Sequence, residues 1–300
     1  MKNSLLLSFV ALGALTSSAI AADLPTKKGP PPAPTIVMAP YSWAGFYVGV
    51  NGGYADPTAK LGVAPSGGWA GPPIDPDWNA NANGPGVAAL GTHDIGLHGF
   101  VGGAQLGYNY QISNFVLGAE ADADYMNLKG SYSTPAYPGI AGGTLPNDTY
   151  WASGSASLNS LFTLRLRAGI AVDHWLFFAT GGVAITGEKF SQSINYLNVP
   201  PPPPPPTVIT SPVLTLPITG SGGGANAGSA STTAVTGVFG GGVEYAFDNH
   251  WSLKGEYLYV PLKSLGFTSV STANSAYTIQ HHESLSALNI FRVGLNYRFQ

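Results

Sequence analysis

Charged side chains recur at every second position in several apolar segments of this 300-residue chain. Arg165 and Arg167 alternate with leucine and alanine in one segment, and Glu120, Asp122 and Asp124 alternate with alanine in another. Side chains on a β-strand point alternately to opposite faces, so each such segment has one charged face and one apolar face. The charged residues on these faces are Glu120, Asp122, Asp124, Arg165, Arg167, Glu244, Lys254, Glu256, Arg292 and Arg298.

Five cations and five anions on these faces allow three kinds of chemistry. Fully paired, they form a network of ion pairs that holds an enclosed space shut; less tightly paired, they line a narrow ion pathway. Paired carboxylates also occur at hydrolytic sites, but no nucleophile and base accompany these in an interpretable arrangement. We therefore predict no catalytic residues and no enzyme, and we carry forward the paired network, with the ion pathway as the alternative.

Eight strand-like segments must position these side chains, and the connections between them alternate in length. The segments span 44–55, 98–110, 115–127, 160–172, 175–187, 236–247, 251–262 and 287–299. The short connections are 111–114, 173–174 and 248–250, and the long ones are 56–97, 128–159, 188–235 and 263–286. Short turns at one end and long loops at the other are typical of transmembrane β-barrels, with the turns in the periplasm and the loops outside.

The charged faces decide which side of each strand meets lipid. In 287–299 the residues from Phe291 onward alternate strictly between aromatic or aliphatic and polar. A charge at mid-depth against lipid costs about 2–4 kcal/mol, so we expect the charged faces to line the lumen. An eight-stranded barrel has an interior just wide enough for side chains to fill, which disfavours a wide pore. Segment 175–187 is apolar on both faces, and its phase stays open.

Aromatic residues cluster near the predicted short turns. Amphipathic rings prefer the headgroup level of a membrane, so we expect a belt at that depth. Its predicted members are Trp43, Tyr108, Tyr110, Phe115, Trp175, Phe247, Trp251, Tyr297 and Phe299.

The ends and the overall composition agree with an exported protein. Residues 1–21 have the charged, apolar and small-residue regions of a signal peptide, and 22–42 form a proline-rich periplasmic tether before the barrel at 43–299. The chain has no Cys, so it is neither a lipoprotein with a modified Cys nor a disulfide scaffold. Only 9% of its residues are charged, and its net charge of -3 argues against a nucleic-acid partner. The long loops are rich in Gly and Pro, so we expect them to bury no core and to be mobile.

Four histidines lie on or near the predicted outer loops: His93, His98, His281 and His282. Imidazole is a good iron ligand, and the first and fourth loops adjoin when a barrel closes, so these residues are candidate haemin contacts. Tyr277 and Trp78 could cover a porphyrin face. The alternative is that these histidines are merely solvated, and His281-His282-Glu283 lacks the spacing of a helical zinc motif. We predict no metal site and no resident cofactor.

Several motifs resemble the small outer-membrane surface proteins of alphaproteobacteria. They are Ala22-Asp23-Leu24-Pro25, Trp43-Ala44-Gly45-Phe46-Tyr47-Val48-Gly49, Thr180-Gly181-Gly182-Val183-Ala184 and Val293-Gly294-Leu295-Asn296-Tyr297-Arg298-Phe299. The resemblance implies an OmpA-like, porin-like eight-stranded barrel in the outer membrane, with haemin binding attributed to some members. It implies no active-site residues. The family usually ends in an aromatic residue, whereas Gln300 follows Phe299 in this chain.

We therefore predict an all-β fold, an eight-stranded antiparallel transmembrane barrel with short periplasmic turns and long extracellular loops. Its function is a structural or surface role with at most a narrow ion pathway. The expected partners are outer-membrane lipid and lipopolysaccharide, and the barrel-assembly machinery through the C-terminal strand. The alternatives are a haemin or small-solute uptake protein and, from another class, a soluble secreted β-sandwich adhesin.

Overall fold

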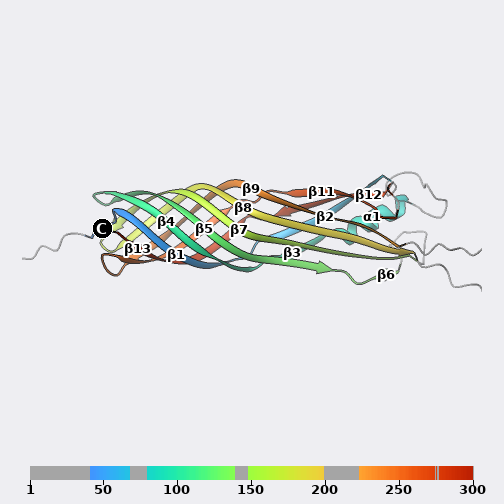
Figure 1. Cartoon of the computed structure of the whole chain (residues 1–300), viewed down its shortest axis with the longest axis horizontal. Coiled ribbons are helices and arrows are strands. Elements are labelled where there is room, and N and C mark those ends of the chain that lie inside the picture. The colour runs from blue at the N-terminus through green and yellow to red at the C-terminus, as the bar shows by residue number, and fades with distance from the viewer. Residues whose placement is uncertain are drawn as a thin grey trace, which may run out of the picture. The chain divides into compact units, whose positions relative to one another are not determined.

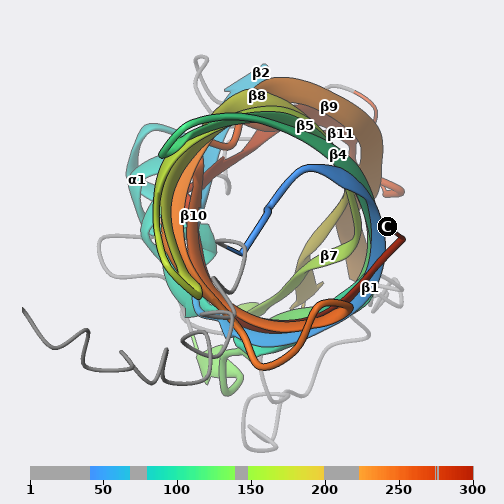
Figure 2. The same ribbon diagram turned by 90° about the vertical axis from the view of Figure 1, so that its left-hand side faces the viewer.

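Eight antiparallel strands pair edge to edge into a closed ring in the computed structural model, which describes residues 41–67, 80–138, 148–198, 223–273, 275 and 277–299. Pairing of the first strand with the last and of β5 with β7 closes the ring, which Figure 2 shows end-on. Its strands are β1 (Gly45–Ala55), β4 (Gly99–Ile112), β5 (Phe115–Ser133), β7 (Asp148–Val172), β8 (Trp175–Asn198), β9 (Gly223–Ala246), β10 (Trp251–Val260) and β13 (Leu288–Arg298) (Figure 1). The predicted eight-stranded fold is confirmed.

Some sequence predictions concern residues that are not described. The signal peptide at 1–21, the tether up to residue 40, Trp78 and Gln300 lie outside the described residues. No helix among the residues described is long and apolar enough to cross a membrane.

Four strands continue well beyond the predicted ends, so the predicted loops 128–159 and 188–235 are wrong as boundaries. β5 runs on to Ser133, β7 already begins at Asp148, and the β8–β9 pair extends to Leu197 and Gly223. In β7 the serines at 153, 155 and 157 alternate with small or apolar residues that are buried. This period of two is the pattern of a strand with a hydrophilic outer face. The segment was nevertheless predicted as a loop because of its polar composition.

A second sheet occupies the first and fourth connections, so the expectation of coreless loops is wrong there. Its strands are β2 (Thr58–Gly67), β3 (His93–Gly96), β11 (Leu265–Val270) and β12 (Tyr277–Leu285), in the order β11-β12-β2-β3. Helix α1 (Ala80–Gly91) precedes β3, and the two-residue strand β6 (Tyr137–Pro138) pairs with β7. Together with the extended strands this sheet encloses two apolar clusters, one around Leu61 and Leu128 and one around Val63, Val87 and Ile279.

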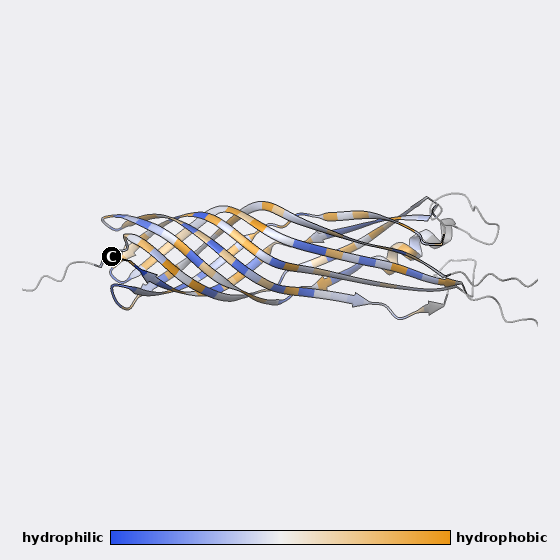
Figure 3. Ribbon diagram, viewed as in Figure 1, coloured by the Kyte–Doolittle hydropathy of each residue, from blue (hydrophilic) through white to orange (hydrophobic). Residues whose placement is uncertain are grey.

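The outer surface of the ring carries an apolar band on the half nearest the tight turns. Leu164 and Leu166 of β7 are 60% and 71% exposed, whereas Arg165 between them is 1% exposed. Figure 3 shows apolar and polar residues alternating along the strands of this half. Exposed aliphatic and aromatic side chains around a closed ring of strands are the lipid-facing surface of an outer-membrane barrel.

Candidate functional site: the charged lumen

Arg165 is the centre of the ion network inside the ring. Its Nη2 atom donates to Glu120 and, at 2.7 Å, to Asp122, while Nη1 donates to Glu256 at 2.6 Å and Nε to Thr163 at 3.1 Å. Glu120 lies directly opposite Arg165 in the β5–β7 register. Strand pairing therefore brings the two opposite charges together, as the alternating pattern predicted.

Arg292 joins the same carboxylates from the other side of the lumen. Its guanidinium lies 2.8 Å from Asp122, 3.0 Å from Asp124 and 2.7 Å from Glu256. Glu256 is its cross-strand partner in the β10–β13 register. Asp122 and Glu256 each contact both Arg165 and Arg292, so the two arginines are tied together through shared carboxylates.

Arg167 and Lys254 supply the positive charges in the part of the network nearer the tight turns. Arg167 lies 2.7 Å from Glu244, and Lys254 lies 2.9 Å from Glu120. Tyr47 donates its hydroxyl hydrogen to Glu120 at 2.6 Å and accepts one from Arg167 at 3.2 Å. The Tyr47 hydroxyl thus links the carboxylate of Glu120 to the guanidinium of Arg167.

These charged groups are almost completely withdrawn from solvent, and the ion-paired side chains are at most 3% exposed. Burial of ions is costly, and the cost is offset only where each charge has good partners. Each carboxylate here accepts at least one hydrogen bond, although Oδ1 of Asp124 and Nε of Arg167 have no partner among the described residues. The arrangement therefore fills the lumen with a cross-linked plug that ties β1, β5, β7, β9, β10 and β13 together.

Nothing in this network has the arrangement of a nucleophilic site. The three hydroxyls that contact its carboxylates, those of Tyr47, Thr163 and Ser252, all donate to them, at 2.6 Å each. All six histidines lie at turns or in the region of the second sheet, away from these carboxylates. Among the residues described, no group of three His, Asp or Glu side chains is placed to hold a metal ion.

Two predicted positions are wrong. Arg298 is buried but is not part of the ion network, because it donates to the Tyr41 hydroxyl at 2.5 Å and to the Ser42 carbonyl at 2.9 Å. Its guanidinium lies 4.6 Å from the Trp43 ring centroid. Trp43 is 0% exposed, so it is not a belt residue but part of an apolar plug that also contains Leu176 and Phe178.

The other predicted belt residues do face outward near the tight turns. Tyr297 is half-buried and packs on His250 and Trp251, with ring centroids 5.6 and 5.1 Å apart. The remaining members, all exposed, are Tyr108, Tyr110, Phe115, Trp175, Phe247, Trp251 and Phe299.

The four candidate haemin histidines do not converge on one point. The second sheet does join the first and fourth connections, since β12 pairs with β2 and β2 with β3. However, His281 is 2% exposed and both its ring nitrogens are engaged, with Ser269 at 2.7 Å and Gln192 at 3.0 Å. His282 points to the opposite, exposed face, and His93 lies on Tyr132 with ring centroids 4.1 Å apart. The exposed His98 pairs with Lys129 on the barrel wall.

Two buried carboxylates in the extracellular part escaped the sequence analysis. Glu188 and Glu283 are 2% and 1% exposed, and Oε2 of each has no hydrogen-bond partner within the described residues. Burial, reinforced by the charge of Glu188, raises the pKa of Glu283 to about 7, and burial lowers the pKa of His281 to about 4. The sequence did contain a signal, because His281 and Glu283 lie on the same strand face as the apolar residues Tyr277, Ile279 and Leu285.

Comparisons with known proteins agree with this architecture. Residues 7–299 match the family described as outer membrane protein beta-barrel domain. The 31 kDa outer-membrane immunogenic protein of Brucella melitensis is 30% identical over the whole length of both chains. The 25 kDa outer-membrane immunogenic protein of Brucella abortus is 33% identical over 43% of this chain and 47% of its own length.

Among solved structures, the outer membrane protein OprG of Pseudomonas aeruginosa is similar with a TM-score of 0.38 and 9% identity, covering 86% of this chain and 97% of that one. The family match over nearly the whole sequence and the full-length relative are decisive for the assignment. The chain therefore belongs to the outer membrane protein beta-barrel domain family, and it is an integral β-barrel of the outer membrane.

Proposed function

We propose that this protein is a closed barrel that conducts no ions and that serves as a structural and surface-presenting element of the outer membrane. The observation that carries the proposal is the filling of the lumen by successive layers of side chains. The Trp43 plug lies nearest the tight turns, the ion network around Arg165 follows, and the apolar cluster around Leu61 and Leu128 lies beyond it.

The layers act against conduction in different ways. The ion network leaves no unpaired mobile charge to attract an ion, because its cations and carboxylates are bonded to one another. The apolar side chains of the clusters on both sides cannot replace a hydration shell, so an ion passing them loses water without compensation from these side chains. The same filling supports a non-enzymatic role, because the carboxylates of the network are engaged in ion pairs with Arg165, Arg167 and Arg292.

The test is planar-bilayer conductance of the refolded full chain. We expect no stable single-channel current steps at potentials where a general porin, refolded in the same way as a control, does conduct. Insertion is checked separately by heat-modifiable gel migration of the same sample. Reproducible unitary steps from correctly inserted protein would contradict the proposal.

We also propose that the C-terminal strand is the segment handled by the barrel-assembly machinery. Phe291 and Val293 on the outer face of β13, and Phe299 directly after its last residue, are all more than half exposed. Replacing Phe299 by Ala should lower the amount of assembled barrel in cells without altering refolding in detergent. Equal accumulation of variant and wild-type protein would speak against this role.

A further inference from the structure

A row of cationic and hydroxyl side chains crosses the outer wall of the barrel. The strand registers pair His98 with Lys129, Lys129 with Ser157, Ser157 with Lys189, and Lys189 with Ser231. Residues paired in this way point to the same face of the sheet. His98, Lys129, Lys189 and Ser231 are exposed and Ser157 is half-buried, so the whole row faces outward.

The row lies just beyond the lipid-facing band on the extracellular side. Phe100, two residues from His98 on the same face, is 56% exposed, and Tyr125, two outward positions before Lys129, is 61% exposed. At about 3.3 Å per residue, Lys129 is about 13 Å along a tilted strand from Tyr125. A lysine ammonium on its flexible stem at this height reaches the headgroup region.

No acidic residue in the described part of the chain pairs with the lysines of this row. Neither Lys129 nor Lys189 forms an ion pair within the described residues, whereas Lys60 on the second sheet lies 4.0 Å from Asp94. The acidic residues of β5, β8 and β9 are all buried: Glu120, Asp122, Asp124, Glu188 and Glu244. The exposed lysines of this wall can therefore attract an anion.

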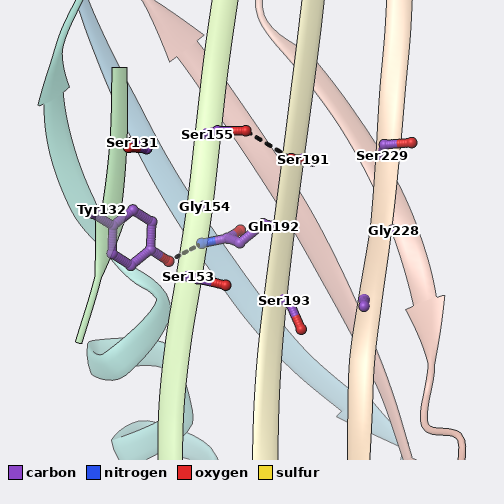
Figure 4. Close-up of a pocket in the computed structure, with 11 residues that line it drawn as sticks. Ser131, Tyr132, Ser153, Gly154, Ser155, Ser191, Gln192, Ser193, Gly228 and Ser229 are labelled. Carbon is purple, nitrogen blue, oxygen red and sulfur yellow. Dashed lines mark hydrogen bonds between the residues drawn. The ribbon is translucent and has the colours of Figure 1, made fainter. Parts of the chain in front are cut away.

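Serine hydroxyls cover the wall immediately above the row. Ser131, Ser155, Ser191 and Ser229 stand in register on four neighbouring strands and line a surface hollow of about 550 Å³ (Figure 4). Ser155 and Ser191 lie 2.9 Å apart and share a hydrogen bond. Hydroxyls both donate and accept hydrogen bonds, so this surface suits another polyhydroxyl compound, such as a sugar.

We propose that this wall binds the phosphorylated sugar headgroup of an outer-leaflet glycolipid, that is, lipopolysaccharide. Its acyl chains lie on the apolar band, a phosphate lies over Ser157 between Lys129 and Lys189, and sugars lie on the serine rows. Strands are about 4.8 Å apart, so the two lysines are about 10 Å apart at their bases and can converge on one phosphate. This lipid site goes beyond the closed-barrel function and does not depend on whether the lumen conducts.

The test compares two charge-matched double variants of the full chain refolded in detergent. Lys129→Gln/Lys189→Gln removes the proposed phosphate ligands, and Lys60→Gln/Lys263→Gln removes two other exposed extracellular lysines. Affinity is measured for purified lipopolysaccharide, for the same material after enzymatic removal of its phosphates, and for phosphatidylglycerol. Heat-modifiable migration verifies that each variant has folded.

We expect the 129/189 variant to bind lipopolysaccharide at least about tenfold more weakly than wild type, and the 60/263 variant to stay within about twofold. Wild type should bind the dephosphorylated glycolipid about as weakly as the 129/189 variant binds the intact one. An unchanged affinity of the 129/189 variant, or an equal loss in the 60/263 variant, would overturn the site. An equal loss for phosphatidylglycerol, or full competition by equimolar inorganic phosphate, would overturn the assignment to a glycolipid.

Discussion

At the scale of single residues, burial reverses the usual roles of polar and apolar side chains in the membrane part of this barrel. Leu164 faces lipid and Arg165 faces the lumen, although they are neighbours in the chain. Shortening a lipid-facing leucine costs little folding free energy, since the lipid around it is as apolar as the side chain that is removed. Arg165, by contrast, has three carboxylate partners that cannot be solvated if it is removed.

We expect Arg165→Leu to destabilise the barrel by about 3–5 kcal/mol, because removing one partner of a buried ion pair leaves the other charge uncompensated. Leu164→Ala should cost distinctly less. The measurement is a urea folding titration of both variants in the same detergent. Equal losses, or a greater loss for Leu164→Ala, would mean that the network around Arg165 does not stabilise the fold.

Glu283 provides a pH-dependent test outside the membrane-spanning part. Its pKa is raised to about 7 from 4.5, so the folded state holds a proton that the unfolded state releases as the pH rises above about 4.5. The stability associated with this proton is complete below that pH and is lost as the pH rises through 7. Glu283→Gln should therefore match wild type near pH 4 and exceed it by up to about 3 kcal/mol at pH 8.

The difference between the two proteins isolates Glu283, since His281 titrates in both. His281 acts in the opposite direction, because a pKa lowered to about 4 means that stability is lost as the pH falls below its ordinary value of 6.5. A stability difference that does not change between pH 4 and 8 would show that Glu283 is not held as a buried acid.

At the scale of elements, the long β8–β9 pair forms part of the extracellular wall. Its upper end is hydrogen-bonded to the fourth connection. The hydroxyl oxygens of Tyr196 and Ser271 lie 2.5 Å apart, and the Asn226 side-chain amide donates to the Tyr277 carbonyl at 3.1 Å. Ile194 belongs to the apolar cluster around Val63. The segment between these strands and the strands themselves should therefore differ in their importance for folding.

Deleting 199–222, which lies outside the described residues, and joining the ends by a short Gly-Ser linker should leave folding intact, because Leu197 and Gly223 are already paired. A longer deletion of 195–230 removes the ties to β12 and should destabilise the extracellular sheet. Hydrogen exchange of β12 distinguishes the two variants. Loss of protection in β12 after the shorter deletion would contradict the expectation.

At the scale of the whole molecule, the barrel has two parts with different surroundings. The lipid-facing band and the ion network lie on the ring strands alone, whereas the upper clusters also need the second sheet. The membrane part should therefore assemble without that sheet, but the upper strand extensions should not stay ordered without it.

Replacing 58–96 and 264–286 by short linkers tests this division. We expect the shortened protein to insert and to show heat-modifiable migration, because its lipid contacts and ion pairs are unchanged. The upper parts of β7, β8 and β9 should become sensitive to protease, because their apolar inner faces lose their cover. Limited proteolysis with mass spectrometry locates the cuts; a variant that fails to insert would show that the two parts fold as one unit.

The sequence by itself determined the elements whose physics is local. Alternation with a period of two defines both faces of a strand, so Glu120, Arg165 and Arg292 could be placed in the lumen. The alternation of short and long connections between eight such segments predicted the barrel. The same rule extends to Ser155 and Glu283, where the alternation is present but is masked by a composition typical of loops.

Only the tertiary structure decided contacts between residues that are distant in the chain. Trp43 and Arg298 fit either the belt or the lumen by their sequence pattern, and only closure of the ring brings Arg298 onto Trp43 and Tyr41. Leu176 and Phe178 face inward because the lumen at that depth has room for an apolar plug, which an apolar strand cannot reveal. The second sheet likewise depends on pairing β2 with β12, more than 200 residues away in the chain, and no local pattern specifies such a register.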